Sequence, residues 1–228
     1  MLNTLSDLYP LLLTILAFDG LLMAFLLWAV TSKRYGKYRI RTPATYRIPK
    51  EKKIKNISMN MALSLGLLLA ILYVFQGFLV SEGSVSGATV FGQVVGSLLL
   101  YDFMYYFMHR AMHHPKLMKY VHGVHHFVRF PTSVESIYLH PIENIAGLTL
   151  LMFSISLVGP VSILSFGIIF FVYSTINILV HSNLDLPHPA FRLLNFWALK
   201  HDLHHGKHLN KNYASITPFW DFLFGTYA

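Results

Sequence analysis

The sequence contains no cysteine and few charged residues. Of its 228 residues, 12% are charged and 54% are hydrophobic, and the mean hydropathy is +0.50. The absence of cysteine excludes disulfides, thiolate zinc sites and cysteine-bound iron–sulfur clusters, so imidazole is left as the principal ligand for a transition metal. A chain this apolar is unusual for a soluble protein, and we expect an integral membrane protein.

Acidic residues are scarce, and the basic residues are unevenly placed. The formal net charge is +8, and ten of the eighteen lysines and arginines fall in residues 32–56, between two apolar segments. This clustering is typical of a juxtamembrane cytoplasmic loop and argues against nucleic acid as a partner. We expect residues 1–56 to form a first transmembrane helix with this loop, and residues 57–228 to form one histidine-rich domain.

Four apolar runs predict how the chain crosses the membrane. Residues 9–30, 59–80 and 88–108 each approach the ~20 residues that cross about 30 Å of hydrocarbon. The fourth run, residues 144–180, is broken at Gly159 and Pro160, which predicts a short helical hairpin that need not traverse the bilayer completely. The predicted fold is an all-α integral membrane bundle of about four to five spans, with a helical cap.

The basic residues also predict the orientation. With the loop in the cytoplasm, all eighteen lysines and arginines fall on the cytoplasmic side, together with every histidine cluster. We therefore expect a multi-pass protein of a bacterial inner membrane or of the endoplasmic reticulum, with its histidines at the cytoplasmic ends of the spans.

Histidines are concentrated in three clusters. Two of them share the spacing HxxHH, and the first has the spacing HxxxH; the clusters are His109 and His113, then His122, His125 and His126, then His201, His204 and His205. Helical residues three and four apart are neighbours, so we expect each cluster to lie on one face of a helix. Neutral imidazoles at these spacings predict a metal site.

Several functions are compatible with such a set. A single surface histidine is the common case, and we assign His114, His188 and His208 there, while the choice between His113 and His114 as a ligand stays open. A zinc peptidase would carry the glutamate of an HExxH motif, which this chain lacks, and a transporter would place ionisable groups inside its spans. Eight or nine imidazoles can instead supply four or five ligands to each of two metal ions, a set that suits iron and dioxygen. A non-catalytic or zinc-dependent metal-binding membrane protein is the alternative.

Six segments, in order, carry a resemblance to a known family. HRAMHH, HGVHH, HPIEN, VHSNLDLP, HDLHH and NYASITPFWDFLFGT resemble the fatty acid hydroxylase and sterol desaturase superfamily of membrane-bound di-iron oxygenases, over residues 101–226. The resemblance implies two iron ions, with zinc as a metal that the purified protein can also hold. It implies hydroxylation or desaturation of a membrane lipid, such as a fatty acyl chain or a sterol, with O2 as co-substrate and electrons from a separate reductase or small carrier protein. Such lipids would reach the metals through an apolar tunnel. The particular lipid, the electron donor and the oligomeric state stay open.

The resemblance also implies roles for single residues. The implied metal ligands are His109, His113, His122, His125, His126, His181, His201, His204 and His205, with Asn177 as a direct or water-mediated ligand in place of a histidine found in some members. Glu143 belongs to an HPxE motif that we expect beside the metals or at the substrate entrance. Because a ligating imidazole usually donates its second N–H to an acid, Asp102 and Asp202 are predicted supporting carboxylates, as are Glu135 and Asp221. For Asp202 and Asp221 a cap or surface role is an equal alternative.

Overall fold

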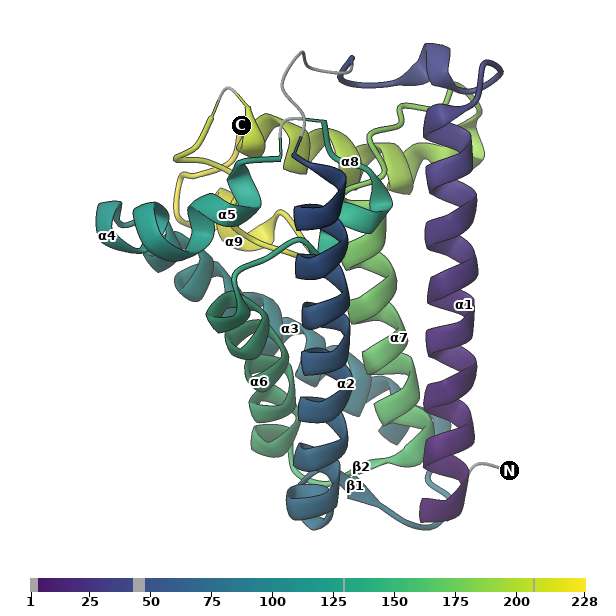
Figure 1. Ribbon diagram of the computed structural model, residues 1–228. Coiled ribbons are helices and arrows are strands. Elements are labelled where there is room, and N and C mark those ends of the chain that lie inside the picture. The colour runs from purple at the N-terminus through teal and green to yellow at the C-terminus, as the bar shows by residue number, and fades with distance from the viewer. Residues whose placement is uncertain (1–3, 43–47, 129, 207) are drawn as a thin grey trace.

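The structure, a computed structural model, describes residues 4–42, 48–128, 130–206 and 208–228. A bundle of long helices dominates this part of the chain (Figure 1), formed by α1 (Leu5–Thr31), α2 (Lys50–Leu79), α3 (Gly87–Met112), α6 (Pro141–Val158) and α7 (Ile163–Leu179). All but α7 are long and apolar enough to cross a membrane. The prediction of an all-α, multi-pass membrane bundle is confirmed, with α7 as the shorter arm of the predicted hairpin.

Two helices extend beyond their apolar runs. Helix α2 begins at Lys50, directly after Pro49, because lysine is a good helix former and a proline is well accommodated at a helix start. It therefore runs without a break through residues 56 and 57, where we expected a domain boundary; that division stays a prediction. Helix α3 continues to Met112 because no helix-breaking residue follows its apolar run, which places His109 in its last turn. Pro43, in the basic loop, lies outside the described residues.

The hairpin of α6 and α7 turns at a glycine. Gly159 follows the last residue of α6 with φ of 104°, a conformation that side chains with a Cβ rarely adopt. The next residues form β2 (Val161–Ser162), which pairs in parallel with β1 (Val80–Ser81). This short pairing ties the α6–α7 turn to the end of α2, at the end of the bundle opposite the cap (Figure 1).

The bundle core is apolar, with polar contacts at selected crossings. Helix α6 packs against α2 and α3, and α7 packs against α1 and α3. Asn144 on α6 donates from Nδ2 to Oδ1 of Asn60 on α2 at 3.1 Å, and its Oδ1 accepts a hydrogen bond from Ser64 at 2.9 Å. Large apolar side chains elsewhere on the spans face outward, as Tyr73 does with 81% exposure, so the outer surface suits lipid.

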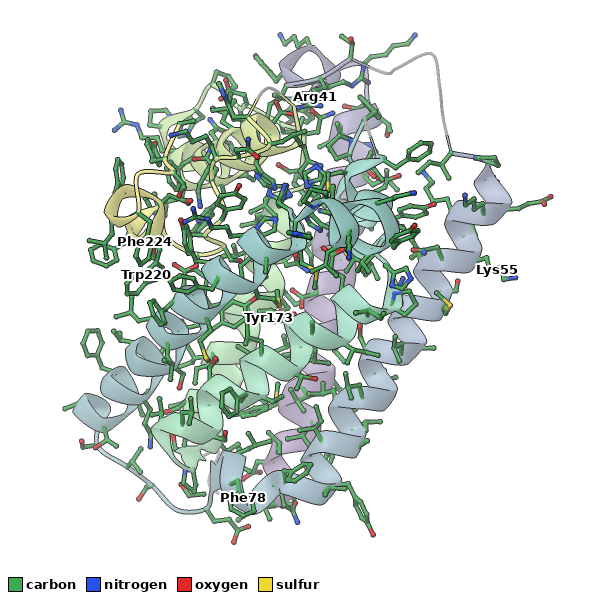
Figure 2. The ribbon with its side chains drawn as sticks, turned by 90° about the vertical axis from the view of Figure 1, so that its left-hand side faces the viewer. Arg41, Lys55, Phe78, Tyr173, Trp220 and Phe224 are labelled. Carbon is green, nitrogen blue, oxygen red and sulfur yellow. The ribbon has the colours of Figure 1, made fainter. Side chains whose placement is uncertain are left out.

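Short elements cover the end of the bundle where α1 ends and α2 begins. They are η1 (Gly36–Tyr38), α4 (Pro115–Leu117), η2 (Met118–His122), α5 (Gly123–His126), η3 (Ser133–Ile137), η4 (Pro189–Phe191), α8 (Arg192–His205) and α9 (Phe219–Leu223). The basic loop is fixed to this cap, because Asn183 Oδ1 accepts a hydrogen bond from the Arg41 backbone N–H at 2.8 Å and the Arg41 side chain pairs with Asp202. In Figure 2, Arg41 lies at the cap end, Phe78 at the opposite end and Tyr173 between them.

Candidate metal centre

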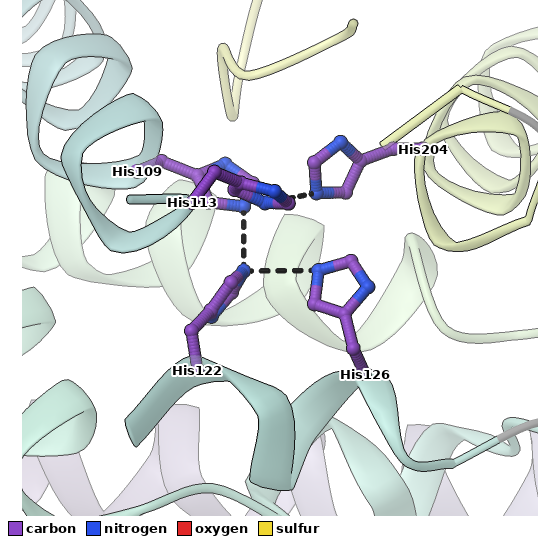
Figure 3. Close-up of side chains that lie close together, drawn as sticks. All are labelled: His109, His113, His122, His126 and His204. Carbon is purple, nitrogen blue, oxygen red and sulfur yellow. Dashed lines mark hydrogen bonds between the residues drawn. The ribbon is translucent and has the colours of Figure 1, made fainter. Parts of the chain in front are cut away.

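Nine of the thirteen histidines come together where the cap meets the bundle. They are supplied by the end of α3, by η2 and α5, by the turn after α7 and by α8. The rings form two groups, and within each group the candidate ligand atoms lie within 4.8 Å of one another. The first group (Figure 3) is His109, His113, His122, His126 and His204, and the second is His125, His181, His201 and His205.

The closest approaches within each group join Nε2 atoms. In the first group the Nε2 separations are 3.2 Å for His109 and His122, 3.1 Å for His113 and His204, and 3.0 Å for His122 and His126. In the second group they are 3.1 Å for His125 and His181, 3.1 Å for His125 and His205, and 3.0 Å for His181 and His201. Both groups therefore converge through the same ring atom.

In four of the nine rings, among them His109 and His204, the opposite ring atom, Nδ1, is bound to a backbone carbonyl. His109 Nδ1 donates to the Tyr213 carbonyl at 2.7 Å, and His204 Nδ1 donates to the Lys211 carbonyl at 2.6 Å. A neutral imidazole has one N–H, so these rings present Nε2 as a bare acceptor. Acceptor lone pairs that face one another at about 3 Å repel unless positive charge lies between them. The donor set therefore fits bound metal cations.

The Nε2 separations also bear on the coordination geometry. Metal–nitrogen bonds of about 2.1 Å would place neighbouring nitrogens about 3.0 Å apart at right angles and about 3.4 Å apart in a tetrahedron. The closest separations, 3.0–3.2 Å, fall in this range. The first group offers five donors, one more than the four ligands of a structural zinc site.

Burial keeps the rings neutral. It lowers the pKa of His122 and of His181 to about 4 and that of His125 to about 3. For His204 and His205, burial and then the neighbouring rings hold the pKa well below its usual range. The neutral imidazole is the form that binds a metal, so no proton has to leave these rings at pH 7.

Each HxxHH cluster divides between the two groups, which differs from the shared face that we expected. His122 and His126 join the first group and His125 the second, whereas His201 and His205 join the second and His204 the first. In a helix, residues i+3 and i+4 point about 100° apart, one on either side of residue i. Each cluster can therefore supply both groups.

The first cluster is also resolved by the geometry. His113, at the C-cap of α3, belongs to the first group. His114 is exposed, and its Nδ1 accepts the Lys116 backbone N–H at the start of α4. His188 and His208 are likewise exposed and lie in neither group, as expected.

A π-helical turn precedes His125 and His126. The N–H of Gly123 bonds to the carbonyl of Met118, five residues earlier, and closes η2. A Cβ at Gly123 would lie 2.3 Å from that carbonyl oxygen, so the turn requires glycine. The turn carries His122 at its end and delivers α5 to the site.

Of the predicted carboxylates Glu143, Asp102 and Asp202, Glu143 contacts a histidine. Glu143 Oε1 accepts a hydrogen bond from His122 Nδ1 at 2.8 Å, the carboxylate–histidine pairing typical of metal sites. For Asp102 and Asp202 the structure shows different partners. Asp202 pairs with Arg41, and Asp102 binds backbone N–H groups. Neither acid has a hydrogen bond to a histidine ring among the described residues.

Asp102 and Asp221 together hold the segment 213–217. Asp102 accepts the N–H groups of residues 215, 216 and 217 at 2.7–3.0 Å, and Asp221 accepts those of residues 213 and 214 at 2.7 and 3.1 Å. This fixes the Tyr213 carbonyl that orients His109. Lys200 donates to the Ala214 carbonyl at 2.5 Å and lies 3.3 Å from Asp221, so its charge offsets that of the carboxylate.

The roles of Tyr213, Lys211 and Lys200 were missed by sequence reasoning. Tyr213 and Lys211 act through backbone carbonyls, which leave no side-chain signal. Tyr213 lies within the closing NYASITPFWDFLFGT pattern, and Lys211 directly precedes it. Lys200 is buried, which is rare for a lysine without a charged partner. The signal in the sequence was its position directly before the HDLHH cluster. Glu135 binds Lys53 at 2.6 Å and caps Thr132, and contacts no histidine ring among the described residues.

A cavity connects the two groups with the interior of the bundle. It encloses about 870 Å³, including the part open to solvent, and its lining includes histidines of both groups. Tyr101, Tyr105, Tyr173 and Asn177 also line it. The Asn177 carbonyl accepts a hydrogen bond from His181 Nδ1 at 3.0 Å, so this residue contacts the group that has four histidines rather than five.

Known proteins share this part of the chain. The family model described as fatty acid hydroxylase matches residues 94–226. The chain is 34% identical to methylsterol monooxygenase 1 of Rattus norvegicus over 138 residues, covering 58% of this chain and 45% of that protein. It is 34% identical to sphinganine C4-monooxygenase 1 of Arabidopsis thaliana over 144 residues, covering 59% of this chain and 54% of that protein. The chain thus spans about half the length of the curated relatives it matches, and no solved structure matches it significantly.

Proposed function

Because the chain belongs to the fatty acid hydroxylase family, we propose that it is a membrane-bound oxidoreductase that uses two iron ions and O2 to hydroxylate a lipid, with desaturation as the alternative reaction. The observation that carries the proposal is the pair of imidazole groups whose bare Nε2 atoms converge beside one cavity. The named relatives act, by their names, on methylsterols and sphinganine, and both are lipids.

The proposed ligands follow the two groups. His109, His113, His122, His126 and His204 would hold one iron, and His125, His181, His201 and His205 the other, with Asn177 as a further ligand, direct or through water. When bound, an iron pair supplies the activation of O2 that C–H oxidation requires. Glu143 would hold His122 in the orientation and tautomer that leave Nε2 free. Asp102 would act by holding segment 213–217, and Asp202 by holding Arg41 over the cap.

The residues around the cavity would bind the lipid and limit water. The cavity lies between α3, α6 and α7 on the bundle side, so a lipid can present a carbon to the site from the interior of the bundle. The cap covers the site on its other side, where Arg41 lies over α8. Restricting water at the reacting carbon would reduce unproductive side reactions.

We also propose that the histidines lie at the cytoplasmic face. The support is charge: ten of eighteen lysines and arginines lie in residues 32–56, and the described part of that segment is bound to the cap that holds the histidines. This face would receive electrons from a separate reductase or small electron carrier. The sequence carries no Rossmann glycine motif and no cysteine that could hold an iron–sulfur centre.

Isotope transfer tests the function. The protein in membranes is supplied with iron, a reductase system and ¹⁸O-labelled O2, with methylsterols, sphingoid bases and fatty acyl lipids as candidate substrates, and the lipids are examined by mass spectrometry. Label in a new hydroxyl supports hydroxylation, and a new double bond without label indicates desaturation. A product that forms equally well without O2, or whose oxygen comes from water, would refute the oxygenase.

A further inference from the structure

The bundle side of the cavity carries polar groups among apolar ones, whereas we expected an apolar tunnel. Three tyrosines line it below the histidines. The ring of Tyr101 lies 5.5 Å from that of Tyr105 and 5.4 Å from that of Tyr173, and the Tyr105 ring lies 5.3 Å from that of His109. A substrate that reaches the metals therefore passes phenol hydroxyls rather than a purely aliphatic wall.

Some of these polar groups have capacity to bind a ligand. The described residues offer no hydrogen-bond partner to the hydroxyl of Tyr105 or of Tyr173, and the Oε2 atom of Glu143 is buried without one. By contrast, the side chain of Asn144, in the same lining, is already bound to Asn60 and Ser64. The two phenol hydroxyls and Glu143 Oε2 can therefore bind a ligand in this cavity.

The cavity has room for a ligand beside Tyr173. The nearest atom to a Cβ built at Gly147 is the Tyr173 hydroxyl oxygen, at 3.8 Å, so the glycine leaves that hydroxyl uncovered by a side chain. Filling this space with hydrocarbon would displace water from the hydroxyls and from Glu143 and leave them unpaired, which costs free energy. A ligand hydroxyl at the same place would pair with them. Sites built to bind a hydroxyl discriminate strongly against an analogue that lacks it.

We propose that Tyr105 and Tyr173 are specificity residues that bind a hydroxyl of the lipid substrate close to the carbon that is oxidised. The Tyr105 ring lies 5.3 Å from that of His109, and Tyr173 lines the same cavity as His181, so a hydroxyl bound here lies beside the metal-binding rings. Lipids with a polar group beside the reacting carbon fit this cavity. An acyl chain oxidised far from its head group does not, because only hydrocarbon would face the phenols. The inference rests on the proposed function, since it assumes that the cavity receives the substrate.

Competition between paired lipids tests this. The metal-loaded full chain is placed in nanodiscs, without O2 or reductant, with equimolar sterol and 3-deoxysterol, or with sphinganine and its 3-deoxy analogue, and the bound ratio is measured by native mass spectrometry. We expect the hydroxylated member of at least one pair to be preferred about threefold to tenfold, the range for one net hydrogen bond. Tyr105→Phe and Tyr173→Phe each move this ratio toward one, whereas Tyr73→Phe, on the exposed face of α2, leaves it unchanged.

The outcomes separate this inference from the oxygenase. No preference in the unaltered protein, or an unchanged ratio in both phenylalanine variants at normal metal content, overturns the inference. The bound ratio is measured without turnover, so it reports on the tyrosines even if no lipid is oxidised. Conversely, labelled product together with an unchanged ratio would leave the oxygenase in place and remove the role of the tyrosines.

Discussion

Glu143 offers a selective test of the two-metal arrangement. Among the described residues, its carboxylate is the one in hydrogen-bond contact with a histidine of either group, and the partner, His122, is 1% exposed. In Glu143→Ala the Nδ1–H of His122 loses its acceptor and the ring loses its orientation. Loss of such a partner typically lowers metal affinity 10- to 100-fold, or about 1.4–2.7 kcal/mol. Glu143→Gln keeps an acceptor oxygen and loses only the charge, so we expect a smaller loss.

The effect should fall on one metal. His122 belongs to the first group. In the second group the Nδ1 atoms of His125 and His181 are bound to the backbone carbonyls of Tyr138 and Asn177, which this substitution leaves in place. Purified variants are dialysed against graded chelator and their metal content is measured. We expect Glu143→Ala to lose one of two ions at a chelator concentration that removes neither from the unaltered protein.

Glu135→Gln is the matched control. Glu135 is a buried carboxylate of the same region that binds Lys53 and Thr132. The Glu135→Gln variant should retain both metal ions. Simultaneous loss of both ions in Glu143→Ala, or equal loss in Glu135→Gln, would contradict the assignment of His122 to a separate five-histidine site.

Further predictions concern the ligands, the segment 213–217, pH and topology. His204→Ala should lower metal content and abolish lipid oxidation, while His208→Ala, at an exposed position, should do neither in the same metal analysis and product assay. Asp221→Asn should lower the thermal midpoint, because the amide keeps only one acceptor oxygen, so one buried N–H group is left unpaired at about 1–3 kcal/mol and Lys200 loses its counter-charge; a midpoint within error of the unaltered protein would argue against this anchor. The metal-free protein should lose stability as pH falls from about 6.5 toward 4. In this range the histidines of the unfolded chain bind protons, whereas His122 and His181 of the folded chain, with a pKa of about 4, do not. Each such histidine lowers the free energy of unfolding by about 1.4 kcal/mol per pH unit, and a thermal midpoint that stays constant over this range would refute the prediction. Reporter fusions should place Ala228 in the cytoplasm and Gly83 outside, and a cytoplasmic signal at Gly83 would reverse the proposed orientation.

Local pattern determined the bundle and the candidate ligands. Apolar runs of about twenty residues can satisfy their backbone in lipid only as helices, so hydropathy alone predicted α1, α2, α3 and the α6–α7 hairpin. The ends of the helices were harder to predict, because α2 and α3 extend into polar residues with good helix propensity. The histidine clusters were visible because ligands on one helix recur at fixed spacings. All nine histidines now found in the two groups could be named from sequence and resemblance.

Only the tertiary structure decided how those histidines are shared. Spacing gives the angle between His125 and His126 around a helix axis, but contacts with distant segments decide that His125 meets His181 and His205 while His126 joins the group of His109 and His204. The same holds for the acids. Asp102 was predicted to orient a ring, yet it binds the N–H groups of a segment more than a hundred residues later, and Tyr213 of that segment orients His109 through a carbonyl. The chain by itself therefore determined helices and ligand types, which depend on neighbours within a few residues. The partition into two metal groups and the polar cavity depend on contacts between distant segments, which no local period encodes.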